Sequence, residues 1–155
     1  MNTNQDFNRV ANILAAKLLK YEPVILIVLL AAILLKYFHL PATSEICTIV
    51  LSSIAMLYFI ATYSAPENKV SKPFGLMLNK LFGFSSAICV LGILFALQKW
   101  HGSNSMLTVG SVTLFLCLGY IIFQKENTIF NKYQIIRLVV LTALSAVFFY
   151  LNYQN

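Results

Sequence analysis

The stretch Leu94–Gly110, LFALQKWHGSNSMLTVG, decides how this chain folds. It contains the end of one apolar run, a polar turn with the only tryptophan, and the start of a second apolar run. Sixty residues earlier, Leu34–Val50 reads LLKYFHLPATSEICTIV and repeats this order in a looser form. Each stretch predicts a hairpin of two helices, and the adjoining apolar runs approach the length that crosses a membrane.

The composition is typical of an integral membrane protein. Of the 155 residues, 59% are hydrophobic and only 10% are charged, whereas a soluble domain has roughly a quarter charged residues. So few charges cannot cover a globular surface, so we expect lipid to cover it. The net charge of +6 does not indicate a nucleic-acid partner, because the basic residues flank apolar runs and form no patch interleaved with aromatics.

The chain reads as a single all-α membrane domain over 1–155, made of two transmembrane hairpins plus a C-terminal fifth span. Helical spacing of apolar residues before the first span predicts an amphipathic helix in the membrane interface, and Glu22-Pro23 is expected to end it. The alternative is a cytoplasmic extension of the first transmembrane helix. The expected segments are an amphipathic helix at 7–21, spans at 23–38, 45–63, 81–98, 105–123 and 134–151, and a linker at 64–80.

The distribution of Lys and Arg predicts the orientation. Five spans place nine of the eleven basic residues on the side of the amino terminus and only Lys36 and Lys99 on the other. Because basic loops stay in the cytoplasm, we expect a bacterial inner-membrane protein with a cytoplasmic amino terminus and a periplasmic carboxyl terminus. Arg137, in the first turn of the fifth span, is counted among the nine and is expected to snorkel to the interface.

An internal repeat would explain the similar hairpins. At an offset of sixty residues, three positions are identical and the two turns fall in the same register. Apolar sequences share this many identities by chance, so duplication and coincidence are both open. The identical positions are Ile33, Leu34 and Thr48, which align with Ile93, Leu94 and Thr108.

The sequence offers little chemistry. None of the five acidic residues lies deep in a predicted span, which argues against an ion-driven transporter, because such proteins use buried carboxylates. No Cys/His spacing indicates a metal, and the three cysteines lie in apolar runs as small packing residues. We therefore predict no enzyme activity and no catalytic, cofactor-binding or metal-ligating residue.

Two groups of residues are candidates for contacts instead. The hairpin turns expose side chains at one membrane face, where a partner could bind, and Trp100 suits either an interface anchor or such a partner. Small residues on the spans would let helices approach closely. The turn candidates are Lys36, His39, Pro41, Trp100, His101 and Gly102, and the packing candidates are Ser52, Ser53, Gly83, Ser86, Gly92, Gly110 and Gly119.

At its turns the sequence resembles the transmembrane hairpin of the gliding-motility GldL family. The second hairpin supplies Gly92-Ile93-Leu94-Phe95, Trp100 with Gly102, and Met106-Leu107-Thr108-Val109-Gly110 followed by Thr113. The first supplies Lys36, His39 and Pro41-Ala42. The resemblance implies an outward turn and a cytoplasmic amino terminus.

Motor function does not follow from this resemblance. The family's ion-motor glutamate would fall at Leu114 in the second hairpin and at Ile54 in the first, and both residues are apolar. A fifth span also stands in place of the family's long cytoplasmic carboxyl-terminal region.

The favoured function is a non-enzymatic scaffold or accessory subunit that packs against itself or another membrane protein. The first alternative is a small transporter or channel for an uncharged or lipid-like substrate, with spans lined by Ser and Thr. The second is a membrane redox subunit that uses His39 and His101 as ligands.

Overall fold

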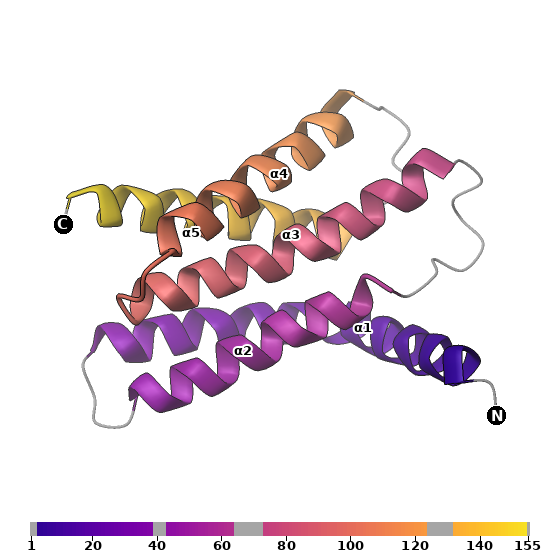
Figure 1. Ribbon diagram of the computed structural model, residues 1–155, viewed down its shortest axis with the longest axis horizontal. Helices are drawn as coiled ribbons and strands as arrows, with labels where there is room; N and C mark the ends of the chain where they lie inside the picture. Colours follow the sequence, from indigo (N-terminus) through magenta and orange to yellow (C-terminus); the bar gives the residue numbers. More distant parts are fainter. Residues whose placement is uncertain (1–2, 39–42, 64–72, 124–131, 155) are drawn as a thin grey trace.

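A computed structural model describes residues 3–38, 43–63, 73–123 and 132–154, and these residues form an all-helical bundle (Figure 1). This confirms the expected helical class. The helices are α1 (Thr3–Tyr37), α2 (Thr43–Ala61), α3 (Pro73–Leu97), α4 (Ser103–Phe123) and α5 (Lys132–Gln154).

Neighbouring helices in the chain pack against each other, and α3 lies at the centre of the bundle. It contacts α2, α4 and α5, while α1 packs on both α2 and α5. The end of α1 and the start of α2 lie at the same end of the bundle as the turn between α3 and α4 (Figure 1). We call this end the turn end, and the opposite one, where α2 ends and α3 begins, the linker end.

Four helices of the described chain are long and apolar enough to cross a membrane. They cover Thr43–Ala61, Lys80–Leu97, Ser103–Ile122 and Tyr133–Leu151, close to the last four spans expected from the sequence. In α3, 56% of the residues in the apolar segment are buried inside the bundle, against 22–28% in the other three helices. Most of the apolar surface of α2, α4 and α5 therefore faces outward.

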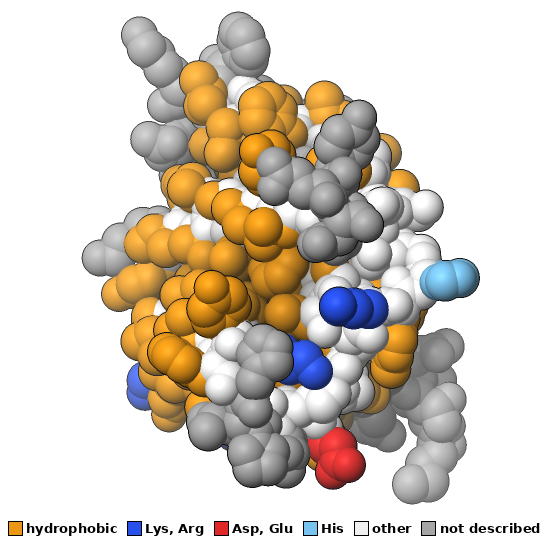
Figure 2. All heavy atoms as spheres, turned by 90° about the vertical axis from the view of Figure 1, so that its left-hand side faces the viewer, with side chains coloured by type: hydrophobic (Ala, Val, Ile, Leu, Met, Phe, Trp, Pro, Cys, Tyr) orange, Lys and Arg blue, Asp and Glu red, His pale blue; other side chains and the backbone are white. Residues whose placement is uncertain are grey.

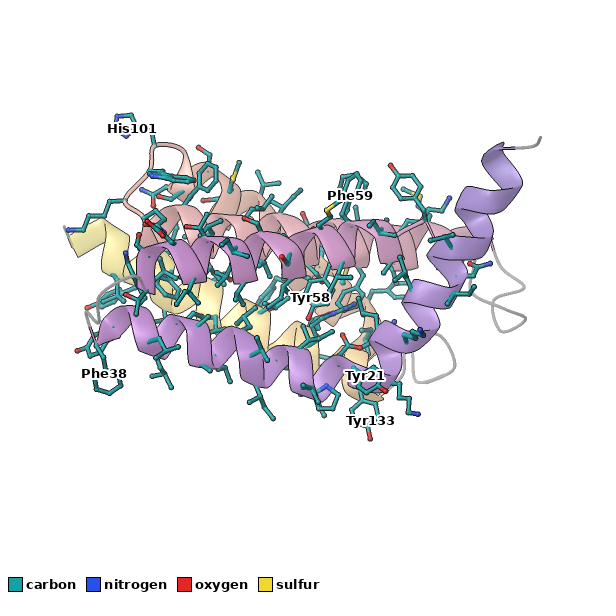
Figure 3. The ribbon with its side chains drawn as sticks, turned by 90° about the horizontal axis from the view of Figure 1, so that it is seen from below. Tyr21, Phe38, Tyr58, Phe59, His101 and Tyr133 are labelled. Carbon is teal, nitrogen blue, oxygen red and sulfur yellow. The ribbon has the colours of Figure 1, made fainter. Side chains whose placement is uncertain are left out.

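The expected end of the amphipathic helix at Glu22-Pro23 needs correction. The helix α1 is continuous from Thr3 to Tyr37 with Pro23 inside it, so Glu22-Pro23 does not separate an interfacial helix from a span. Proline has no N–H to donate to the residue four positions earlier, so it bends a helix without ending it. Figure 3 shows α1 changing direction beside Tyr21.

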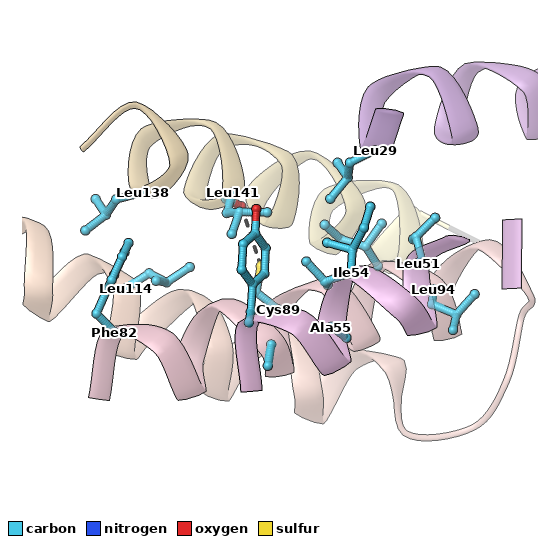
Figure 4. Close-up of a cluster of buried hydrophobic side chains, with 14 of the residues drawn as sticks. Leu29, Leu51, Ile54, Ala55, Phe82, Cys89, Leu94, Leu114, Leu138 and Leu141 are labelled. Carbon is cyan, nitrogen blue, oxygen red and sulfur yellow. Dashed lines mark hydrogen bonds between the residues drawn. The ribbon is translucent and has the colours of Figure 1, made fainter. Parts of the chain in front are cut away.

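The core is a continuous cluster of aliphatic side chains with few aromatic rings. Leu29, Leu51, Leu94, Leu114 and Leu141 are fully or almost fully buried, and Figure 4 shows these residues converging from all five helices. The three cysteines are buried, as expected. Among them, the Cys89 thiol lies 3.6 Å from the carbonyl oxygen of Leu141 and links α3 to α5 (Figure 4).

The predicted packing residues have different positions. A Cβ atom added at Gly110 would lie 3.0 Å from the Cys89 backbone, and one added at Gly92 would lie 3.0 Å from the Leu107 nitrogen. These two glycines therefore let α3 and α4 approach closely. At Gly83 the same atom would lie 2.6 Å from the Thr62 hydroxyl oxygen.

The remaining packing candidates include one buried serine and three outward positions. Ser86 is buried and donates its hydroxyl to the carbonyl of Phe82 at 2.8 Å. Ser52 and Ser53 lie on the exposed side of α2, and nothing lies within 4 Å of a Cβ built at Gly119. Among the described residues, these three positions do not pack helices together.

Gly110 provides a direct test of the α3–α4 contact. We expect Gly110→Ala to lower the free energy of unfolding by about 1–3 kcal/mol, because the new methyl group meets backbone atoms that cannot move aside easily. Gly119→Ala adds the same group in open space and serves as the matched control. Thermal unfolding of both variants in detergent measures the difference, and equal stability of the two would contradict the close approach.

Candidate functional site

The described turn candidates lie together at the turn end of the bundle. Trp100 and His101 are exposed, and Figure 3 shows His101 projecting from this end. Figure 2 views the same end and shows hydrophobic side chains over much of it. His39 and Pro41 lie outside the described residues. Across the part of the chain that the structure describes, no group of three or more His, Cys, Asp or Glu could hold a metal ion.

The turn after α3 is a Schellman motif, in which hydrogen bonds close the last turn of the helix. Trp100 N–H donates to the carbonyl of Phe95 at 2.8 Å, and Lys99 N–H donates to that of Ala96 at 3.1 Å. The rings of Phe95 and Trp100 pack edge to face, with their centroids 5.2 Å apart. This is the hydrophobic contact that a Schellman motif uses. Trp100 therefore has a local packing role besides its exposure.

The αL position of this motif is held by Lys99, with φ of 57°, where glycine is the usual residue. A side chain in this conformation costs about 1 kcal/mol relative to glycine. We therefore expect Lys99→Gly to raise the free energy of unfolding by up to about 1 kcal/mol, measured by thermal unfolding. A destabilised variant would show that the Lys99 side chain contributes more than its backbone strain costs.

Gln98 connects the two hairpins just below this turn. Its amide nitrogen donates to the Ser44 carbonyl at 2.8 Å and to the Thr48 hydroxyl at 2.7 Å. Its amide oxygen accepts from the Ser44 hydroxyl at 2.7 Å and from Lys36 Nζ at 3.5 Å. Gln98 thus uses its full hydrogen-bonding capacity. Lys36, a predicted partner contact, reaches back into the bundle.

The second polar cluster is a buried ion pair near the linker end. Arg137 Nη1 of α5 lies 2.7 Å from Glu22 Oε1 of α1, and the two side chains are 4% and 0% exposed. This overturns two expectations: Arg137 does not snorkel to the interface, and Glu22 is buried within the bundle. Arg137 is five residues into α5, or about 7 Å along the helix axis.

Two aromatic rings hold the Arg137 guanidinium from α2 and α3. Its central carbon lies 4.4 Å from the ring centroid of Tyr58 and 4.2 Å from that of Phe82. Both rings are fully buried, and a desolvated cation–π contact contributes up to about 2 kcal/mol. We call Glu22, Arg137, Tyr58 and Phe82 the ion-pair cluster. It joins α1, α2, α3 and α5 at one point.

Hydrogen bonding in the ion-pair cluster is incomplete. Among the described residues, both carboxylate oxygens of Glu22, the Tyr58 hydroxyl and Arg137 Nε have no hydrogen-bond partner. The short contact between Nη1 and Oε1 is therefore a contact of charges whose angles do not satisfy a hydrogen bond. Each unpaired buried polar atom lowers the free energy of unfolding by about 1–3 kcal/mol, and a charged one by more. The unpaired atoms of the cluster therefore destabilise the fold.

Sequence reasoning missed this cluster because the pairing is not local. Glu22 precedes a proline and Arg137 lies in the first turn of a span, and each position has a satisfactory explanation at the membrane interface. The useful signal was that each is a lone charge beside an apolar run. Only the contact between α1 and α5 shows that the two charges neutralise each other.

Comparisons of the chain with protein-family models, curated proteins and solved structures found no match.

Proposed function

We propose that this chain is a multi-pass membrane protein that acts as a non-enzymatic scaffold or accessory subunit of a membrane complex. The observation that carries the membrane assignment is the apolar outer surface of α2, α4 and α5. Soluble proteins rarely expose large contiguous apolar patches. Large side chains at least half exposed on these helices include Ile46, Ile49, Met56, Val109, Val112, Phe115, Leu116, Ile122, Val139 and Val147.

The orientation proposed from the sequence is compatible with the charges of the described residues. Lys17, Lys20 and Lys80 are exposed in the half of the molecule toward the linker end, and Lys36 and Lys99 lie at the turn end. Pairing with Glu22 removes Arg137 from the count of free charges, and the bias remains eight to two. We propose a cytoplasmic linker end in a bacterial inner membrane, as the GldL-like hairpins also imply.

Small residues on the outer faces support the scaffold role. Ser52 and Ser53 are exposed on α2, and the space beside Gly119 on α4 is open. Helix association within lipid depends on close packing at small residues. A second copy or another membrane protein would find room to approach at these positions.

Self-association in a bilayer tests this role. We expect Ser52→Leu or Gly119→Leu to weaken association measured by energy transfer between labelled copies in liposomes, by about tenfold or more. Val112→Leu is the control, because Val112 is already a large exposed residue on α4. A wild-type protein that stays monomeric in bilayers and purifies without a partner would contradict the scaffold role.

A transporter is the second candidate, and the ion-pair cluster favours it. From the sequence, an ion-driven transporter was not expected, because no acidic residue lies deep in a predicted span. In the structure, however, the Glu22 side chain is completely buried. Ionisable groups within membrane bundles commonly serve substrate or ion pathways. Solute flux into liposomes that is lost in Glu22→Gln would favour transport over the scaffold role. No described contact favours the redox alternative.

A further inference from the structure

We propose that the Glu22 carboxylate is a proton-binding site, and that Tyr58 and Phe82 hold the charged Arg137 side chain in place whether or not the proton is bound. This role goes beyond a scaffold, because it gives the chain a group that exchanges a ligand with water. The cluster supports its two charges differently.

The surroundings support the cation better than the anion. Arg137 has the Glu22 carboxylate at 2.7 Å and two aromatic ring faces at 4.4 and 4.2 Å. Glu22 has the Arg137 contact alone, and neither of its oxygens has a hydrogen-bond partner among the described residues. An ionised carboxylate has about four acceptor sites, and here a single charged contact opposes the cost of burying the anion, so burial favours the protonated form.

The rings remove the usual obstacle to protonation within an ion pair. Neutralising the acid normally leaves a buried arginine without a partner, which is strongly unfavourable. Here the faces of Tyr58 and Phe82 continue to attract the guanidinium. An ion pair that only holds two helices together has no need of a second set of partners for its cation.

The proton balance is simple. A proton from water binds a Glu22 oxygen, Arg137 remains protonated, and the net charge of the cluster rises from zero to +1. Among the described residues, the titratable or charged groups that face Glu22 are Arg137 from α5 and Tyr58 from α2, while Phe82 of α3 does not titrate. The preceding residues Lys20 and Tyr21 are exposed, so the molecular surface lies within one helical turn of the site.

The small number of acids permits a direct test. The chain has five acidic side chains, so D6N/E45Q/E67Q/E126Q leaves Glu22 as the only one. Infrared spectra of this variant in lipid nanodiscs, recorded across a pH series, report the C=O stretch of a protonated carboxyl group. Adding Glu22→Gln to the same background identifies the contribution of Glu22 and subtracts that of the carboxyl terminus.

We expect a Glu22 signal whose midpoint lies above that of an exposed glutamate, which titrates near pH 4.3, because burial disfavours the ionised carboxylate. Arg137→Gln should move the midpoint up by at least about one pH unit, because it removes the cation that favours the ionised form. If the four-substituted variant fails to insert, the difference between wild type and Glu22→Gln gives the same readout. A Glu22 that stays ionised down to about pH 4.3 while the helices remain folded would overturn the proposal.

Discussion

Replacing Glu22 by leucine is expected to lower the free energy of unfolding by about 3 kcal/mol, the low end of the range for a broken buried ion pair, because Arg137 loses its counter-charge and keeps only the two ring faces. Both side chains are almost completely inaccessible to solvent, so water cannot replace the lost partner. Glu22→Gln should cost less, about 1–2 kcal/mol, because the amide keeps the size of the carboxyl group and places a partly negative oxygen beside the guanidinium. Reversible unfolding in mixed detergent measures both variants.

The double variant E22L/R137M provides the decisive control. Replacing a buried ion pair by apolar residues of similar size is often neutral or stabilising, so we expect the double variant to recover most of the stability lost in Glu22→Leu. The resulting coupling energy should be about 2–3 kcal/mol, as for other residues in direct contact. Additive effects of the two substitutions would show that Glu22 and Arg137 do not interact.

Replacing Phe82 by alanine is expected to cost about 3–5 kcal/mol, the usual range for a large aromatic side chain in a packed core. Phe82 is fully buried in α3, the central helix, and its ring lies 4.2 Å from the Arg137 guanidinium carbon. The substitution therefore removes core packing and one of the two rings that hold the cation. In lipid, unlike in water, the hydrophobic effect does not drive helices together. Loss of packing contacts still lowers the stability, because van der Waals packing holds helices together in lipid.

Phe115 is the matched control for this substitution. It is the same residue type in the neighbouring helix α4, but it is 65% exposed on the outer surface. Phe115→Ala should change the free energy of unfolding by less than about 0.5 kcal/mol. Similar losses in the two variants would contradict the placement of Phe82 in the core.

The helical class and most helix positions could be predicted from the sequence because they depend on local patterns. Apolar runs define the last four helices, and Gly92 and Gly110 were identifiable as close-packing positions from residue size alone. Size does not tell which side of a helix faces inward. Ser52 and Gly119 therefore received the same interpretation although they face outward.

The polar contacts could not be predicted because they join distant parts of the chain. Gln98 looked like the polar end of a span, and only the packing of the two hairpins brings it to Ser44 and Thr48. Glu22 and Arg137 are separated by 115 positions, and each had an acceptable explanation at the membrane surface. Pro23 was misjudged for a related reason, since tertiary packing maintains α1 across a residue that usually ends a helix.

Cysteine accessibility in intact cells tests most directly whether the bundle spans the membrane with its two ends on opposite sides. His101 and Lys17 are exposed toward opposite ends, and the native cysteines are buried, so H101C and K17C each add one reactive thiol. The account predicts that a membrane-impermeant thiol reagent labels H101C in intact cells and labels K17C only after permeabilisation. Labelling of both variants from the same side, or recovery of the protein in the soluble fraction, would contradict it.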